Sequence, residues 1–326
     1  MPPPTTVASV LHVPDADEDG FLPEGPRAIE LDGRPALLWV NIQTAADATQ
    51  GALHVRYWDT GGTESCALPG RPGFAFPTDR PGVLLVGMGH QVGTFDLDSY
   101  EWTPLGTIPD PHPRELINDG EVTPDGRAVV FGTKDVRIST GGAEQIASLY
   151  LLTLDDNRVS RLRSGQTCSN GKVFVADPDG LKLYDIDTPT RTIVAYRLDV
   201  ARRQLINVIG GFPTNEGYGY PDGMVDAGDG TVIVAYFNPA PAEAGRAVRY
   251  DLRNGDAIEE WTTPGSPRVT CPCLVQRPDG VKLVLTTATE GMPIEQRAKC
   301  PSAGSLFVAD TLLASVPVVP VVRLGG

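Results

Sequence analysis

The 326-residue sequence is short of charged and aromatic side chains. Charged residues make up 21% of the chain and aromatic residues 7%, and histidine occurs four times. The formal net charge is -14, and no cluster of lysine and arginine is present. Such a field repels nucleic acid and anionic membrane surfaces, so we expect neither as a partner.

Cysteine and long apolar runs are also scarce. Five cysteines, an odd number, argue against a disulfide framework and favour reduced thiols. No apolar run approaches 18 residues, and residues 1–10 lack a basic segment followed by an apolar one. We expect a cytoplasmic protein without a membrane span, either a monomer or a weak homo-oligomer.

Glycine and proline are plentiful, at 36 and 30 residues. They separate short runs of β-branched and aromatic residues, such as 36–40, 128–132 and 232–237, and no long stretch keeps a helical period. This pattern predicts an all-β chain of short strands and tight turns. Closed all-β architectures reach this length, so we expect residues 1–326 to form a single domain.

Turn sequences recur at an interval that suits a repeating unit of four strands. Asp125, Asp179, Asp229 and Asp279 each precede a glycine, at successive spacings of 54, 50 and 50 residues. Repeats of about 40 to 50 residues are typical of propeller blades, whose strands are joined by such hairpin turns. Six units of about 54 residues would fill the chain, which predicts a six-bladed β-propeller.

A second ladder of polar residues runs in step with these turns. Asn118, Asn170 and Asp222 are 52 residues apart in both steps, and Glu24 precedes Asn118 by 94 residues, close to two periods. Each residue stands beside or near a glycine, and taken singly each could be only a hairpin residue. The turn positions, however, are filled about 8 residues later in the same units. We therefore place the ladder at the starts of the innermost strands, facing the central channel.

The same spacing locates the remaining inner strands and the closure of the ring. Two further inner strands are expected near residues 70–74 and 271–274. The segment 6–13 precedes the first inner strand, so we expect it to pair with 305–309 in the last blade. Sharing one blade between both ends of the chain removes an unpaired sheet edge.

The ladder residues offer carboxylate and amide oxygens around one axis, which predicts a central metal site. Without a paired set of histidines or cysteines, such hard donors favour Ca²⁺ or Mg²⁺ over structural zinc. A cation with open positions polarises a carbonyl or phosphoryl group and acidifies water, while Asp222 could accept the proton. No serine nucleophile elbow is present. Metal-dependent hydrolysis is the reaction class that this pattern predicts.

Five short motifs follow one another along nearly the whole chain. Together they resemble those of the gluconolactonase, regucalcin and luciferin-regenerating enzyme family, although each is weak alone. They are Glu24-Gly25-Pro26, Asn118-Asp119-Gly120, Ser169-Asn170-Gly171, Pro221-Asp222-Gly223-Met224, and the segment from Gly245 to Asp251.

The resemblance implies a six-bladed propeller that holds one divalent cation. Ca²⁺ is expected first, with Mg²⁺, Mn²⁺, Fe²⁺ and Zn²⁺ as alternatives. Glu24, Asn170 and Asp222 would be the metal ligands, Asp222 would double as general base, and Asn118 would contact the substrate or the bound water. The family reaction is the opening of sugar lactones, so we expect a lactonase with a small-molecule substrate.

One position departs from the family pattern. Two residues before Asn118, where the family usually has an arginine that contacts sugar hydroxyls, this chain has Leu116. Leucine donates no hydrogen bond, so a less polar or differently shaped ester is an alternative substrate, and His112 or Arg114 could reach the pocket from a lid loop. Further alternatives are a phosphotriesterase-like hydrolase, a non-hydrolytic enzyme of specialised metabolism, and a calcium-binding protein without turnover.

Overall fold

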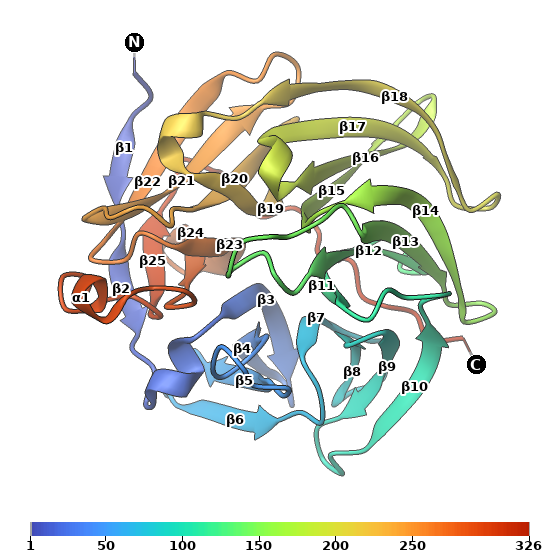
Figure 1. Ribbon diagram of the computed structural model, residues 1–326, viewed down its shortest axis with the longest axis horizontal. Helices are drawn as coiled ribbons and strands as arrows, with labels where there is room; N and C mark the ends of the chain where they lie inside the picture. The colour runs from blue at the N-terminus through green and yellow to red at the C-terminus, as the bar shows by residue number, and fades with distance from the viewer. Residues whose placement is uncertain (1, 326) are drawn as a thin grey trace.

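The computed structural model describes residues 2–325, apart from the side chains of Asp17 and Glu18. Within this range six β-sheets surround a central channel like the blades of a propeller (Figure 1). The all-β six-bladed fold expected from the sequence is therefore confirmed.

Each blade runs from an inner strand at the channel to an outer strand at the rim. Neighbouring strands in a blade are antiparallel. The first three blades consist of β3 (Pro23–Leu31), β4 (Arg34–Asn41), β5 (Ala52–Tyr57) and β6 (Thr63–Ala67); β7 (Pro72–Pro77), β8 (Val83–Met88), β9 (Gln91–Asp96) and β10 (Trp102–Thr107); and β11 (Glu115–Val122), β12 (Ala128–Asp135), β13 (Ala147–Thr153) and β14 (Arg158–Gln166).

The other three blades repeat this order, and all six expected inner strands are present. They consist of β15 (Ser169–Asp177), β16 (Gly180–Asp187), β17 (Thr192–Asp199) and β18 (Gln204–Pro213); β19 (Tyr220–Gly228), β20 (Thr231–Phe237), β21 (Ala244–Asp251) and β22 (Ala257–Pro264); and β23 (Val269–Arg277), β24 (Gly280–Thr287), β25 (Leu306–Asp310) and β2 (Ser9–His12).

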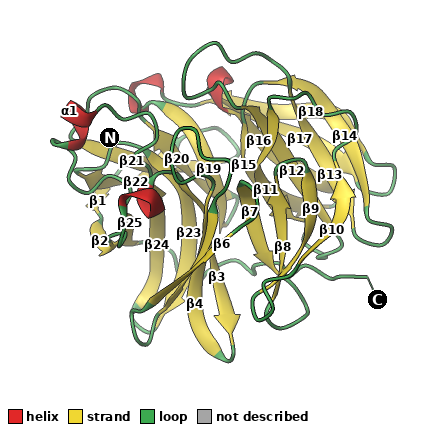
Figure 2. Ribbon diagram, turned by 60° about the horizontal axis from the view of Figure 1, so that its bottom comes forward, coloured by secondary structure: helices red, strands yellow, loops and turns green. Residues whose placement is uncertain are grey.

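Helical structure is limited to short turns, as the lack of a helical period predicted. The described residues form one α-helical turn and three 3-10 turns (Figure 2). These are η1 (Asp17–Gly20), η2 (Thr188–Thr190), η3 (Glu216–Tyr218) and α1 (Ile294–Arg297). No helix within residues 2–325 is long and apolar enough to cross a membrane.

The N-terminal segment closes the ring, as expected, but it does so in two parts. Strand β2 pairs antiparallel with β25, with Ser9 opposite Val308. Strand β1 (Thr5–Val7) instead runs parallel to β22 of the preceding blade, with Thr5 opposite Glu260. Residues 5–12 therefore join the fifth blade to the sixth.

The Asp-Gly ladder forms the hairpins between first and second strands. In the fifth blade β19 ends and β20 begins around Asp229, whose φ of 54° is flanked by φ values of 74° and 72° at Gly228 and Gly230. Backbone in this left-handed region is accessible to glycine, and to aspartate at modest strain. The turn interpretation of this second set of aspartates is confirmed.

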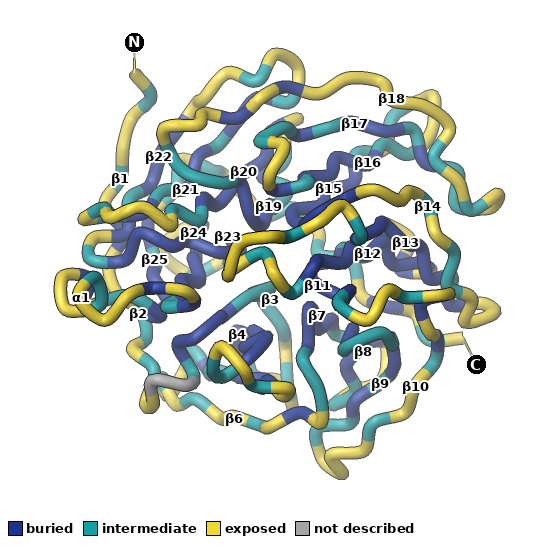
Figure 3. The backbone as a smooth tube through the Cα atoms, in the orientation of Figure 1, coloured by how far each residue is buried: buried dark blue, intermediate teal, exposed yellow. Residues whose placement is uncertain are grey.

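The blades pack face to face, which is why β12 is buried along its whole length (Figure 3). Ala128 and Val130 pack in a cluster with Phe174 of the fourth blade, whereas Phe131 packs with Phe74 of the second. Burying an apolar side chain of this size contributes about 1.5 to 3 kcal/mol. Because neighbouring blades share such clusters, the inner strands are held in fixed positions around the channel.

The C-terminal segment crosses the end of the channel opposite the inner-strand starts (Figures 1 and 2). Residues 316–320 line a cavity of about 280 Å³ there, together with Arg27, Glu121 and Cys271. Val322 is fully buried and its amide donates to the Pro77 oxygen over 3.0 Å. This segment thus docks on the second blade after crossing the channel.

Candidate metal and substrate site

The four polar residues singled out in the sequence meet in one cavity. Glu24 on β3, Asn118 on β11, Asn170 on β15 and Asp222 on β19 all line a cavity of about 350 Å³ at one end of the channel. Asn118, Asn170 and Asp222 are buried, and Glu24 is partly exposed. The structure therefore brings the whole expected set together, from four different blades.

Each of these residues lies at an irregularity in its inner strand. The pairing register shifts between Ile117 and Asp119, so Asn118 is the extra residue of a β-bulge. Similar register shifts follow Glu24 and Asn170. A further shift lies between Pro221 and Met224, the interval that contains Asp222. Bulges bend a strand and re-aim a side chain, and they are frequent beside functional sites. Here they accompany the side chains that face the channel.

Close packing between inner strands explains two of the adjacent glycines. A Cβ atom on Gly171 would lie 2.6 Å from Cβ of Met224, and one on Gly223 would lie 2.5 Å from Sγ of Cys271. Both distances are far below van der Waals contact. The glycines beside Asn170 and Asp222 are thus required by strand proximity at the channel, not by a hairpin.

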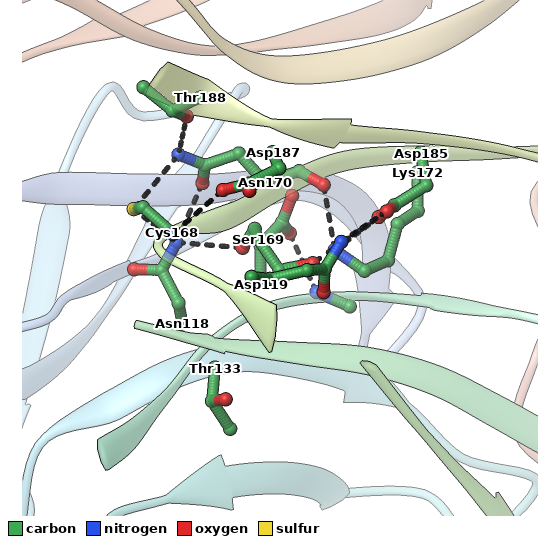
Figure 4. A network of polar contacts seen from close by, with 12 residues as sticks. Asn118, Asp119, Thr133, Cys168, Ser169, Asn170, Lys172, Asp185, Asp187 and Thr188 are labelled. Carbon is green, nitrogen blue, oxygen red and sulfur yellow. Dashed lines mark hydrogen bonds and ion pairs between the residues drawn. The ribbon is translucent and has the colours of Figure 1, made fainter. Parts of the chain in front are cut away.

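A chain of hydrogen bonds crosses three blades and fixes the orientation of two amides (Figure 4). The Thr188 hydroxyl donates to the backbone oxygen of Pro221 over 2.9 Å, so it accepts from Asn170 Nδ2, 2.8 Å away. Asn170 Oδ1 in turn accepts from Asn118 Nδ2 over 2.7 Å. A carbonyl oxygen has two lone pairs, so Asn170 Oδ1 retains one for a ligand.

The start of β15 is held by a second layer of polar groups. The Asp187 carboxylate accepts from the backbone amides of Thr167 and Cys168, over 3.1 and 2.9 Å. The buried Lys172 ammonium donates to the Asn170 backbone oxygen over 2.7 Å and lies 3.5 Å from an oxygen of Asp185. These contacts position the Asn170 side chain independently of any ligand.

Glu24 and Asp222, the two carboxylates of the expected metal-ligand set, are poorly compensated by protein charges. Burial raises the pKa of Glu24 well above its usual range, and the negative charges of Asp222 and Asp119 raise it further. Burial likewise raises the pKa of Asp222, with Asp119 and Glu290 adding to the shift and Lys134 opposing it. Two buried carboxylates that disfavour their own charge would be stabilised by a cation between them.

The donor set fits a hard cation. It has two carboxylates and two amides, and the side chains described by the structure contain no group of three His, Cys, Asp or Glu placed to hold a metal. Oxygen donors of this kind suit Ca²⁺ or Mg²⁺, while zinc sites usually include nitrogen or sulfur. Glu24, Asn170 and Asp222 could hold such an ion, with Asn118 on the wall of the same cavity.

Several residues of the cavity were missed from the sequence. Lys134 is the penultimate residue of β12, Thr188 follows β16, Phe237 ends β20, and Glu290 follows β24. In an antiparallel blade the end of the second strand lies beside the start of the first, so these positions were accessible to sequence reasoning. Leu22, Ile138, Pro189, Tyr220 and Pro239 add apolar and aromatic walls.

The residues expected around the possible lid lie elsewhere. Leu116 pairs across β11 and β12 with Lys134 and does not line the cavity. Arg114 is engaged by Asp135 and Glu144, at 3.1 and 3.0 Å, and neither it nor His112 lines the cavity. The wall on this side comes instead from the segment after β12, which contains Ile138 and Ser139.

Comparisons with known proteins identify the family of this chain. The family model "SMP-30/Gluconolactonase/LRE-like region" matches residues 22–289. An L-arabinolactonase of Azospirillum brasilense is 30% identical over 305 residues, 91% of this chain and 90% of that protein. A regucalcin of Xenopus laevis is 25% identical over 228 residues, 70% of this chain and 73% of that protein. The match to YvrE of Bacillus subtilis, 33% identical over 200 residues, spans 61% of this chain and only 63% of that protein.

Solved structures reproduce the architecture over nearly the whole chain. A calcium-binding protein, regucalcin, from Agrobacterium tumefaciens superposes with a TM-score of 0.77 at 22% identity, covering 98% of this chain and 99% of its own. A luciferin-regenerating enzyme gives 0.74 at 20% identity, covering 93% and 95%. At these identities the likeness concerns the fold.

Proposed function

This chain belongs to the SMP-30/gluconolactonase/LRE-like family, and on that premise we propose that it is a metal-dependent hydrolase that opens a lactone. The observation that carries the proposal is the meeting of Glu24, Asn118, Asn170 and Asp222 around one cavity, with two carboxylates whose pKa values are raised by burial. The L-arabinolactonase named above favours a sugar lactone or a related cyclic ester.

We propose that Glu24, Asn170 and Asp222 hold one divalent cation. Ca²⁺ comes first because all three donors are hard oxygens, and Mg²⁺, Mn²⁺, Fe²⁺ and Zn²⁺ are the alternatives. When bound, the ion supplies Lewis acidity toward the lactone carbonyl and lowers the pKa of the attacking water.

The residues of the chain account for the proton transfers and for substrate orientation. The Asp222 carboxylate accepts the proton of the water whose oxygen attacks the carbonyl carbon, and returns it to the ring oxygen as that C–O bond breaks. Asn118 donates from Nδ2 to Asn170, which leaves its Oδ1 for a substrate hydroxyl. The walls from Leu22, Ile138 and Tyr220 reduce the access of bulk water.

Two other activities suit the same scaffold. A phosphotriesterase-like hydrolase would use the same donors, since phosphoryl and carbonyl oxygens both respond to a hard cation. A calcium-binding protein without turnover, or a non-hydrolytic enzyme of specialised metabolism, would need the cavity but not the proton acceptor. The regucalcin from Agrobacterium is described as a calcium-binding protein, which favours the calcium-binding alternative over the non-hydrolytic enzyme.

The net charge of -14 argues against a nucleic-acid or membrane partner and leaves a small-molecule substrate as our proposal. We also propose a cytoplasmic monomer or weak homo-oligomer built as one domain.

The experiment is acid release from a panel of lactones and phosphotriesters, with and without a chelator. Lactone hydrolysis should require the ion and should fall at least about 100-fold in Asp222→Asn. The matched control is Asp229→Asn, an exposed turn residue of the same blade at the other end of β19. Hydrolysis that ignores the chelator or survives Asp222→Asn would refute the mechanism. Calcium binding with no turnover would favour the binding protein.

A further inference from the structure

Lys134 is a largely buried cation that lines the proposed active site, where its charge acts on the carboxylates of Glu24 and Asp222. It is the penultimate residue of β12 and retains 7% of its surface exposed. Its backbone is fixed from both sides, because it pairs with Leu116 of β11 and forms a bridge to Cys168 before β15. The residue is therefore firmly placed at the cavity wall.

Other buried cations nearby are engaged by protein groups. The Lys172 ammonium donates to the Asn170 oxygen and lies 3.5 Å from Asp185. The Arg268 guanidinium donates to the backbone oxygens of Glu290 and, over 3.4 Å, of Pro239. By contrast, no hydrogen bond or ion pair of the Lys134 ammonium is found within the described part of the chain, although its charge lowers the raised pKa values of Glu24 and Asp222.

An ammonium that lines a cavity without a hydrogen-bond acceptor can bind a ligand that supplies one. The side chain has three donors and no acceptor. The complementary group is an oxygen with negative charge, as in a carboxylate or a phosphate.

The charge of the cavity limits what that ligand can be. The lining carries three carboxylates, on Glu24, Asp222 and Glu290, and two cations, on Lys134 and Arg268, a net charge of minus one. A divalent cation held by Glu24 and Asp222 would bring the net charge to plus one. The loaded cavity would then be complementary to a substrate with a single negative charge.

We propose that Lys134 is a specificity-determining residue that binds an anionic group of the substrate, so that the preferred substrate is a lactone carrying one negative charge. This inference rests on the proposed function, which identifies the substrate as a lactone. Lys134 pairs with Leu116 across β12 and β11. In the third blade the cationic donor therefore stands on the second strand, whereas the facing residue of the inner strand is apolar.

The first test compares two lactones with the same carbon skeleton on calcium-loaded protein. An aldaric acid monolactone carries a carboxylate where the corresponding aldonolactone carries a hydroxymethyl group. The wild type should prefer the former. Lys134→Met should raise the KM for the charged lactone about 10-fold to 100-fold, the loss of a charge-assisted hydrogen bond, and leave that for the neutral lactone within about twofold. Lys134→Arg should restore most of the preference for the charged lactone. A comparison with a phosphorylated aldonolactone shows whether the anion is a phosphate or a carboxylate.

The control is Lys182→Met, which removes an equal charge beside Asp177 in the β15–β16 hairpin of the fourth blade. It should leave both KM values unchanged. An equal loss for both lactones in Lys134→Met would overturn the proposal, since it would show that Lys134 acts on the reacting centre or shields Glu24 and Asp222. A wild type with no preference for the charged lactone would also overturn it.

A binding measurement keeps the inference separate from the proposed reaction. Calorimetry with pyroglutamate, an inert lactam that carries a carboxylate, and with its neutral amide reports the anion site without turnover. Lys134→Met, or Lys134→Gln should the first variant fail to fold, should weaken pyroglutamate binding about 10-fold or more and leave the amide unchanged. If no lactone is hydrolysed by any variant, the proposed function fails, yet selective loss of pyroglutamate binding still supports the anion site. Equal binding to wild type and variant refutes it.

Discussion

Asn118 donates from Nδ2 to Oδ1 of Asn170 over 2.7 Å, across 52 residues of sequence and between two neighbouring blades. The bond is one step in a directional chain that ends at the backbone oxygen of Pro221, next to Asp222. Since a backbone oxygen only accepts, the direction of every hydrogen bond in the chain is determined. The position of Asn170 Oδ1 is thus set by residues that need not touch a substrate.

Removing the middle of this chain should weaken cation binding. Thr188→Val deletes the acceptor of Asn170 Nδ2 and leaves the amide free to turn its nitrogen toward the cation. Loss of such a supporting contact typically costs about 10-fold to 100-fold in metal affinity. Titration calorimetry with Ca²⁺ measures it. Thr190→Val, which removes only an exposed hydrogen bond to the Asp187 oxygen, is the matched control and should leave the affinity unchanged.

Cation binding should stabilise the fold, and this effect should depend on the paired carboxylates. Ligand at about 100 times its Kd raises the free energy of unfolding by about 2.7 kcal/mol. Asp222→Ala should abolish this increase, because alanine offers no oxygen to the ion, and it also removes one of the two carboxylates that disfavour each other's charge. Melting temperatures with chelator and with added Ca²⁺ measure the effect. An unchanged calcium effect in Asp222→Ala would exclude Asp222 as a ligand.

The glycine at the fourth inner strand should be intolerant of any side chain. In Gly171→Ala the new Cβ would meet Met224 Cβ at 2.6 Å and the Asp222 backbone oxygen at 2.8 Å. Relieving such overlap typically costs about 1 to 3 kcal/mol, and it would displace the strand that carries Asp222. Urea denaturation gives the stability. Gly62→Ala, whose nearest neighbour would be 3.5 Å away in a loop, should change it little.

Stability should fall at acid pH through His54, which is far from the candidate site. Its ring stacks on Trp39 at 5.1 Å between centroids, and Nδ1 lies 2.8 Å from Ser65 Oγ. Burial, with a smaller effect of His12, lowers the pKa of His54 from 6.5 to about 4. The unfolded chain therefore binds a proton that the folded protein does not, between these two values. This contribution is complete above pH 6.5 and is lost as the pH falls toward 4.

His54→Gln should remove this loss of folding stability at acid pH. The loss amounts to about 3 kcal/mol at most, because the pKa of His54 differs by about 2.5 between the folded and unfolded states and each pKa unit corresponds to about 1.36 kcal/mol. Urea denaturation at pH 7 and at pH 4.5 measures the difference between variant and wild type, so that other titrating groups cancel. His112→Gln, on an exposed loop, is the control. Equal slopes in variant and wild type would show that His54 titrates normally.

The inner part of the fold could be predicted because its spacing is regular. Every blade except the second has an Asp-Gly turn after its inner strand, so the starts at Glu24, Asn118, Asn170 and Asp222 followed from intervals alone. The same residues proved to share a cavity. Their roles as metal ligands, base and substrate contact remain predictions.

What escaped prediction depends on contacts between blades. Lys134 is the penultimate residue of β12, whereas Glu290 lies three residues beyond the end of β24, so no constant position relative to the second strand marks them. The sequence also singled out Leu116 as the residue facing the substrate, whereas the bulge at Asn118 leaves Leu116 off the cavity and opposite Lys134. A bulge changes which side chains reach the channel, and the local sequence did not reveal it.

The pairing of Ser9 with Val308 couples completion of the ring to the last stage of synthesis. These residues lie 299 positions apart, so β2 leaves the ribosome long before its partner β25 exists. Until then the nascent chain presents an unpaired strand at its start and five growing blades with an open flank. Exposed strand edges invite pairing with other chains. The protein is therefore most vulnerable to aggregation during translation, just before the sixth blade is finished.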